Sequence, residues 1–290
     1  MTLYSIKDLE YLSGIKAHTI RIWEKRYGLL DPNRTDTNIR SYSDDDVRKI
    51  LNVALLVKNG YKISSVASFD DVKIQAEVLR INKISNDPDK SIDQLIFHTL
   101  NFDVFEFEQF VDQLITKTGL SKTMQNVVFP FFDRVGILWQ TGSIFAAHEH
   151  FVSNLIRNRL IREIGRFHIQ ETSKTALFFL RENEMHEIGL LYSYFLAAES
   201  GLHCIYLGQS LPFADLANLL VNSKFDFVVT SFVNAIEKPE LEQYLANLSL
   251  VFNRNKILIS GRQIAILQPE LPSNVQVVKN SNDFVRKISS

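Results

Sequence analysis

The sequence has little of what several large protein classes depend on. Its 290 residues include one cysteine, Cys204, which excludes a disulfide framework or a thiolate metal cluster and fits a reducing compartment. No run of eighteen apolar residues occurs, and the N-terminus has no charged segment followed by an apolar core. We therefore expect neither a membrane span nor a signal peptide, and we predict a cytoplasmic protein that does not contact membranes.

An excess of charge of either sign is also missing. The formal net charge is −1, so any contact with nucleic acid must come from a local basic patch. No G-x-G-x-x-G follows the first apolar run of the C-terminal segment, which argues against dinucleotide binding. What the chain does have is 46% hydrophobic residues, enough for two or three compact domains with their own cores.

Residues 1–69 have the pattern of a helix-turn-helix. A first helix with apolar positions at helical spacing ends at Gly14, and a second runs from about Ala17 to Tyr27 with Ile20 and Trp23 turned inward. The outward side chains of this second helix are polar and basic: Lys16, His18, Thr19, Arg21, Lys25 and Arg26. A polar hairpin tip over residues 32–40 and a third helix follow, which together form a unit suited to DNA.

These residues resemble the MerR family of transcriptional regulators in YSIKDLEYLSGIKAHTIRIWEKRYGLL, PNRTDTNIRSYSDDDVRKI and LLVKNGYKISSVA. The resemblance implies a winged helix-turn-helix that binds promoter DNA as a dimer. Residues 1–68 carry eleven Lys or Arg against eight Asp or Glu, and the excess lies on the recognition helix and wing, where phosphates are neutralised. We expect these residues to contact DNA: Lys16, His18, Thr19, Arg21, Arg26, Tyr27, Arg34, Arg40 and Tyr42. The alternative is a small helical domain with a solvated basic face.

The middle of the chain predicts a helical bundle. Residues 70–90 are polar, contain Pro88 and read as a linker. Four amphipathic segments with short connections then fill residues 91–170, which favours a four-helix bundle with Phe102, Phe105, Phe107 and Phe110 in its core.

Residues 171–290 alternate short β-rich runs with helical stretches. The runs begin near Ala176, His203, Phe225, Lys256 and Val275, and this alternation predicts a doubly wound parallel sheet of the flavodoxin-like kind. The fold class is thus multidomain, with a winged helix-turn-helix, a four-helix bundle and an α/β domain in that order.

One hexapeptide, Glu184-Met185-His186-Glu187-Ile188-Gly189, follows the first of these runs. A strand-to-helix junction presents ligand-binding groups, so His186 can ligate a metal while Glu184 accepts the proton on its other ring nitrogen. Gly189 lets the first helical turn lie close to a ligand. The alternative is a solvated loop histidine, with Glu187 at the helix N-terminus.

Two motifs together resemble the light-responsive, B12-dependent MerR-type repressors, the CarH/LitR type. Trp139 is followed, after nine residues, by Glu149 and His150, and the hexapeptide matches E/D-x-H-x-x-G. The resemblance implies that His186 is the lower cobalt ligand of cobalamin, adenosylcobalamin or methylcobalamin, and that Trp139, Glu149 and His150 cover its upper face. Ser231 and Gly261 would lie beside the nucleotide tail.

The sequence departs from this pattern at two places. Ser260-Gly261-Arg262 replaces the usual Gly-Gly, and Gln140 stands where these photoreceptors have a histidine after the tryptophan. From the resemblance as a whole we predict a one-component repressor that senses a corrinoid, forms a dimer or tetramer and is not an enzyme. The substitution at Gln140 leaves two possibilities open, a response to light or a response to cofactor abundance. Alternatives are a MerR-type regulator with a cofactor-free sensor domain that binds a partner protein, and a corrinoid-dependent methyltransferase subunit.

Overall fold

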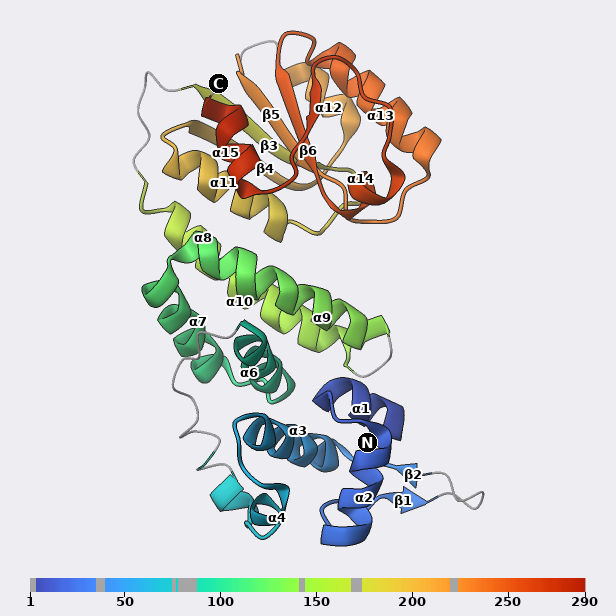
Figure 1. Ribbon diagram of the computed structural model, residues 1–290. Coiled ribbons are helices and arrows are strands. Elements are labelled where there is room, and N and C mark those ends of the chain that lie inside the picture. The colour runs from blue at the N-terminus through green and yellow to red at the C-terminus, as the bar shows by residue number, and fades with distance from the viewer. Residues whose placement is uncertain are drawn as a thin grey trace. The chain divides into compact units, whose positions relative to one another are not determined.

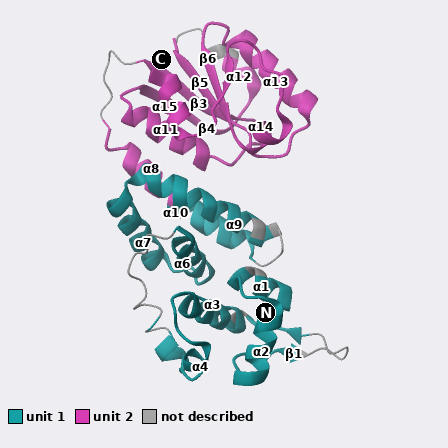
Figure 2. Cartoon of the chain, viewed as in Figure 1, with its two compact units in different colours: residues 1–155 teal, residues 156–290 magenta. Residues whose placement is uncertain are grey.

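The computed structural model describes residues 4–34, 40–74, 77, 88–140, 144–167, 174–219 and 224–289. The chain divides into two compact units, residues 1–155 and 156–290 (Figure 2). The boundary falls inside one helix, α10 (Ala146–Ile164). The predicted boundary between bundle and α/β domain lies later, at residues 170 and 171.

The N-terminal part is a winged helix-turn-helix, as predicted. Its elements are α1 (Ile6–Ser13), α2 (Ala17–Tyr27), the antiparallel pair β1 (Asn33–Arg34) and β2 (Arg40–Ser41), α3 (Asp44–Lys58) and α4 (Ile63–Val66) (Figure 1). Two serines start helices through capping boxes, in which Ser5 and Ser43 bond reciprocally with Asp8 and Asp46. Gly14 and Gly28 adopt left-handed conformations that end α1 and α2.

Four helical stretches build the bundle. They are α6 (Pro88–Leu100), α7 (Val104–Thr118), the run of α8 (Leu120–Thr123), η1 (Met124–Val128) and α9 (Phe129–Gln140), and α10. Asp93 of α6 accepts hydrogen bonds from Lys58 of α3 and Arg134 of α9, both at 2.6 Å. This carboxylate therefore ties the DNA-binding part to the bundle within the first unit.

The η1 segment is a π-helix in an otherwise α-helical run. The amide of Phe129 donates to the carbonyl oxygen of Met124, five residues earlier. Such wide turns are rare and occur often at functional sites. Here the π turn precedes α9, the helix that carries Trp139.

The second unit contains a five-stranded parallel sheet in the order β4-β3-β5-β6-β7 (Figure 1). Its strands are β3 (Thr175–Arg181), β4 (His203–Leu211), β5 (Phe227–Ser231), β6 (Lys256–Ser260) and β7 (Val275–Val277). The helices are α11 (Ile188–Glu199), α12 (Phe213–Leu219), α13 (Lys238–Val251), α14 (Arg262–Leu267) and α15 (Ser281–Ser289). Counted from the first strand of the sheet, the order is 2-1-3-4-5, which is flavodoxin-like and confirms the predicted fold class.

Two of the four phenylalanines that the sequence placed in the bundle core lie at the surface. Phe107 and Phe110 are buried, but Phe102 and Phe105 are 47% and 69% exposed, so only half of the predicted aromatic core is core. Phe102 lies in the turn between α6 and α7 with φ of +50°, where the helical pattern does not apply. Helix α15 was not predicted, although Asn280 before it is a residue that caps helices and accepts a bond from the amide of Asp283.

Candidate DNA interface and cofactor site

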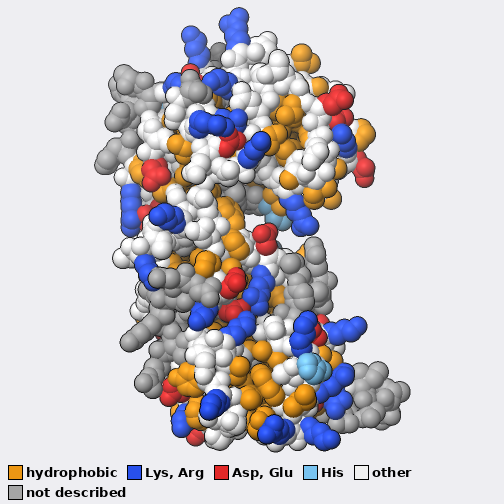
Figure 3. All heavy atoms as spheres, in the orientation of Figure 1, with side chains coloured by type: hydrophobic (Ala, Val, Ile, Leu, Met, Phe, Trp, Pro, Cys, Tyr) orange, Lys and Arg blue, Asp and Glu red, His pale blue; other side chains and the backbone are white. Residues whose placement is uncertain are grey.

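Helix α2, the predicted recognition helix (called the reader helix below), has one face exposed to solvent. Ile20 and Trp23 are buried as predicted, and His18, Arg21 and Arg26 are exposed. Figure 3 shows Lys and Arg side chains gathered on the surface of α1 and α2. Thr19 and Tyr27 are half-buried, and the Arg26 guanidinium lies 5.4 Å from the centre of the Tyr27 ring. Lys16 extends from the start of α2 and pairs with Glu10 at 3.1 Å.

The wing is fastened to the reader helix by one carboxylate. Glu24 of α2 accepts hydrogen bonds from the Tyr42 hydroxyl at 2.5 Å and from the Arg40 Nε at 3.1 Å. Burial, together with the bond to Glu24, raises the pKa of Tyr42. Because Tyr42 is fully buried, this placement does not support its predicted contact with DNA; it holds the wing instead. The side chain of Arg34 lies outside the described residues.

The cofactor prediction centres on Glu184, which is fully buried between two loops of the sheet's carboxyl edge. One carboxylate oxygen accepts hydrogen bonds from the amides of Val233 and Asn234, at 2.9 and 2.7 Å. The other oxygen contacts Nδ1 of His186 at 2.8 Å and accepts the His186 amide at 3.1 Å. Burial alone would raise the pKa of Glu184, but the bonds from His186 and the amides outweigh it and lower the pKa to about 2.

This arrangement places His186 at the point where the strand order reverses. β3 pairs with β4 on one side and with β5 on the other, and ligands of such sheets bind in the crevice outside this reversal. Since Nδ1 faces Glu184, Nε2 is the nitrogen oriented for a metal, and the side chain is 55% exposed. An imidazole whose other nitrogen is held by a carboxylate is one of the ligands that proteins offer to a metal in a macrocycle, so these residues fit a corrinoid.

Two residues with positive φ support the loop that carries His186. Asn183 has φ of +63° and Ser210 has φ of +53°, and the Asn183 amide donates to the Ser210 hydroxyl at 3.1 Å. Asn234 donates its side-chain amide to the Asn183 carbonyl oxygen at 2.8 Å. Strained backbone of this kind persists where the surroundings fix it, which is common at ligand sites.

Glu187, the residue after His186, has a structural role that the sequence did not reveal. It is buried and accepts hydrogen bonds from Arg157 of α10 at 2.5 Å and from the Tyr206 hydroxyl of β4 at 2.6 Å. The loop is thus anchored to a helix 30 residues earlier in the chain. The sequence offers no local spacing that identifies either partner.

The remaining predicted residues of the α/β unit lie at its carboxyl edge. Ser231 ends β5, is buried, and pairs in register with Ser260 of β6. A Cβ added to Gly261 would lie 2.3 Å from the Phe232 carbonyl oxygen, so glycine there permits close backbone packing. A Cβ on Gly189 would meet no atom within 4 Å, so the described structure leaves space beside the start of α11.

The Thr230 hydroxyl, one residue before Ser231, is buried without a hydrogen-bond partner in the described structure. An unsatisfied buried hydroxyl costs free energy. It is therefore a candidate to receive a polar group of a ligand, alongside the predicted Ser231.

The predicted upper residues lie in the bundle unit. Trp139 is 56% exposed at the end of α9, so its ring is accessible rather than part of the bundle core. Glu149 accepts a bond from Ser153 at 2.5 Å and lies 3.2 Å from Nδ1 of His150. Near them, the buried His148 ring stacks on Phe102 and Phe145, with centroid distances of 4.5 and 5.7 Å.

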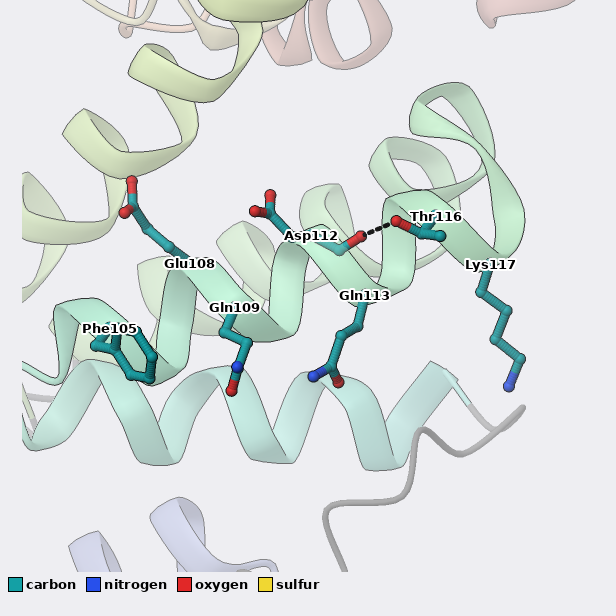
Figure 4. Close-up of a pocket in the computed structure, with 7 residues that line it drawn as sticks. All are labelled: Phe105, Glu108, Gln109, Asp112, Gln113, Thr116 and Lys117. Atoms are coloured by element: carbon teal, nitrogen blue, oxygen red, sulfur yellow. Dashed lines mark hydrogen bonds between the residues drawn. The ribbon is translucent and has the colours of Figure 1, made fainter.

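A hollow of about 740 Å³ elsewhere in the bundle is unrelated to these groups. Its lining residues all come from α7: Phe105, Glu108, Gln109, Asp112, Gln113, Thr116 and Lys117 (Figure 4). None of them is a predicted cofactor residue.

Among the described helices, none has the length and apolar character needed to span a bilayer.

Comparison with known proteins identifies two segments. Residues 4–70 match the family model described as MerR HTH family regulatory protein, and residues 91–162 match the one described as B12 binding domain. The HTH-type transcriptional repressor CarH of Myxococcus xanthus is 28% identical over 263 residues, which cover 84% of each chain. CarA, an HTH-type transcriptional repressor of the same organism, is 26% identical over 247 residues, covering 84% of this chain and 81% of that protein.

Solved structures with a similar fold include a corrinoid protein. The monomethylamine corrinoid protein of Methanosarcina barkeri superposes with a TM-score of 0.52 at 13% identity, covering 69% of this chain and 98% of that one.

Proposed function

We propose that this chain, a MerR-family regulator that carries a cobalamin-binding domain, is a one-component repressor of transcription. It binds promoter DNA through its winged helix-turn-helix and senses adenosylcobalamin or methylcobalamin in the cytoplasm. The observation that carries the sensor assignment is the His186 imidazole, held by the buried Glu184 at the reversal of strand order. The chain is a regulator rather than an enzyme.

When bound, a corrinoid would supply a light-sensitive cobalt–carbon bond. His186 would offer Nε2 as a ligand to the metal, and Glu184 would hold the proton at Nδ1. Trp139, Glu149 and His150 are proposed to cover the upper side. Ser231 and Gly261 are proposed to line the path of the nucleotide tail.

Corrinoid binding would change DNA binding by changing how many copies of the chain assemble. We propose a homo-oligomer, a dimer or a tetramer, whose state depends on the corrinoid. Oligomeric state sets how many reader helices engage one operator together, and this changes apparent affinity without new contacts.

The deciding experiment is the visible absorbance spectrum of the purified protein after incubation with adenosylcobalamin and gel filtration, recorded before and after green light. We expect co-elution at about one corrinoid per chain and a light-dependent change in the spectrum. Protein that elutes without corrinoid absorbance would reject the sensor assignment. That result would favour the alternative of a regulator whose sensor domain binds a partner protein.

A further inference from the structure

The reader helix has one exposed residue that its basic face does not explain. Ile22 lies in the middle of α2 and is 50% exposed. Isolated exposed apolar residues are common on protein surfaces, so exposure alone says little. What sets Ile22 apart is the set of side chains around it.

Helical geometry surrounds Ile22 with polar and cationic residues. The neighbours on a helix surface are three and four positions away, and for Ile22 these are His18, Thr19, Lys25 and Arg26. His18, Lys25 and Arg26 are exposed, whereas Ile20 and Trp23 bury the opposite side of the helix. The β-branched side chain of Ile22 thus forms an apolar spot within the face that meets DNA under the proposed function.

We propose that Ile22 is a specificity-determining residue that contacts the 5-methyl group of a thymine in the major groove. A recognition helix enters that groove, and the thymine methyl is the apolar feature that a base pair displays there. The basic neighbours of Ile22 bind phosphates or base edges, which positions the helix, while Ile22 favours thymine at one position in each half-site. This inference rests on the proposed DNA-binding function.

The test removes the methyl group from the DNA. The full-length protein first selects duplexes from a random pool, and each thymine of the selected site is then replaced singly by deoxyuridine, which lacks only that methyl. At one thymine per half-site we expect a loss of affinity of about fourfold, the change that ~0.8 kcal/mol per buried carbon represents. Ile22→Ala should lose this sensitivity at that position, and Ile22→Val should retain most of it.

Ile161→Ala is the matched control, because Ile161 of α10 is similarly exposed, at 42%, and lies outside the proposed interface. It should show the same deoxyuridine penalty as the unmodified protein. If no deoxyuridine weakens binding, or if the penalty is equal in Ile22→Ala, the inference is overturned while the proposed function stands. If selection enriches no duplex, the DNA-binding function fails and the inference fails with it.

Discussion

The His186 imidazole depends on a partner that cannot easily move. Glu184 is held by the amides of Val233 and Asn234 as well as by His186 itself. A carboxylate fixed in this way fixes the tautomer and orientation of the ring, which tunes its strength as a ligand. The two residues therefore have separable effects.

We expect His186→Ala to abolish corrinoid binding or to shift the spectrum of the bound form, because the lower nitrogen ligand is lost. Glu184→Gln should weaken binding by about 10- to 100-fold, the usual effect of removing a partner of a metal ligand. Titration of each variant with adenosylcobalamin, followed by absorbance, measures both. Glu182→Gln, an exposed glutamate of the same loop, should change nothing, and an unchanged spectrum in His186→Ala would refute the ligand assignment.

We predict that Gln140 determines how the proposed cofactor site behaves after illumination. A carboxamide is a poor cobalt ligand beside an imidazole, because its oxygen is a weak donor and its nitrogen lone pair is delocalised. Illumination of the native protein should therefore end in release or hydration of the cofactor, without a stable product held by two histidines. Gln140→His should create that product, seen as a persistent new spectrum under green light. A two-histidine spectrum in the native protein would contradict this prediction.

Spacing along the sequence predicted contacts between neighbouring residues, but it did not predict which distant residues surround them. The Glu184 and His186 pair was predictable, because two residues of separation bring the carboxylate to Nδ1. The amides of Val233 and Asn234 were not, since they lie 49 and 50 residues away. The bond of Tyr42 to Glu24 was not predictable for the same reason: it joins residues 18 apart, and only the folded wing brings them together.

At the scale of elements, α2 and the wing carry the DNA-binding prediction. Arg21 is exposed on α2, so Arg21→Ala should weaken operator binding by ~1–3 kcal/mol if the guanidinium reads a base. If it neutralises a phosphate instead, the slope of log affinity against log salt should fall by about one. Fluorescence anisotropy over a salt series distinguishes the two. Arg254→Ala, in the second unit, serves as the control, and full retention of affinity and slope by Arg21→Ala would exclude a role for this side chain.

Helix α6 contains a buried histidine from which we predict that the stability of the bundle depends on pH. His98 is 2% exposed, lies between the rings of Phe97 and Phe110, and has no hydrogen-bond partner on either ring nitrogen in the described structure. Burial lowers its pKa, and the carboxylate of Asp103, 3.9 Å away, opposes this in part. The fold therefore favours the neutral ring.

Because the folded pKa lies below the unfolded one, the contribution of His98 to stability is complete above pH 6.5 and is lost as the pH falls through the folded value. We expect the urea midpoint of the helical signal to drop between about pH 7.5 and about pH 5. His98→Phe should reduce this drop, whereas His203→Gln, a partly exposed histidine of β4, should not. An identical pH dependence in His98→Phe would show that other groups cause it.

At the scale of the whole molecule, alternation of elements made the architecture predictable. Parallel strands joined by right-handed helical crossovers admit few orders, and the apolar runs of the C-terminal segment located every strand. The helix α10 was harder, because periodicity does not show that one helix belongs to two compact units. Long-range contacts decide such divisions, and they are not encoded locally.

Assembly is the prediction that belongs to this scale. We expect sedimentation velocity in the dark to show a larger species with adenosylcobalamin than without it, and green light to reverse the change. Operator affinity should follow the same order, because linked reader helices bind with a higher effective concentration. His186→Ala should stay in the corrinoid-free state under both conditions. A sedimentation coefficient that ignores cofactor and light would exclude assembly as the signal.

The π turn of η1 sets the phase of everything that follows it in the same helical run. It spans Met124–Val128 and holds one more residue per turn than an α-helix, so each later position is advanced by one residue, or about 100° around the axis. The direction in which Trp139 points from the helix axis therefore depends on a turn more than ten residues earlier in the chain. Deleting a single residue within Met124–Val128 would convert the π turn to regular α-helix while keeping the orientation of α9. A conversion to a regular helix at constant length would instead rotate the Trp139 side chain to another face. In this run, inserting or deleting one residue has the same effect as rotating the later part of the helix about its axis. The direction of the tryptophan side chain can therefore change without any substitution at position 139.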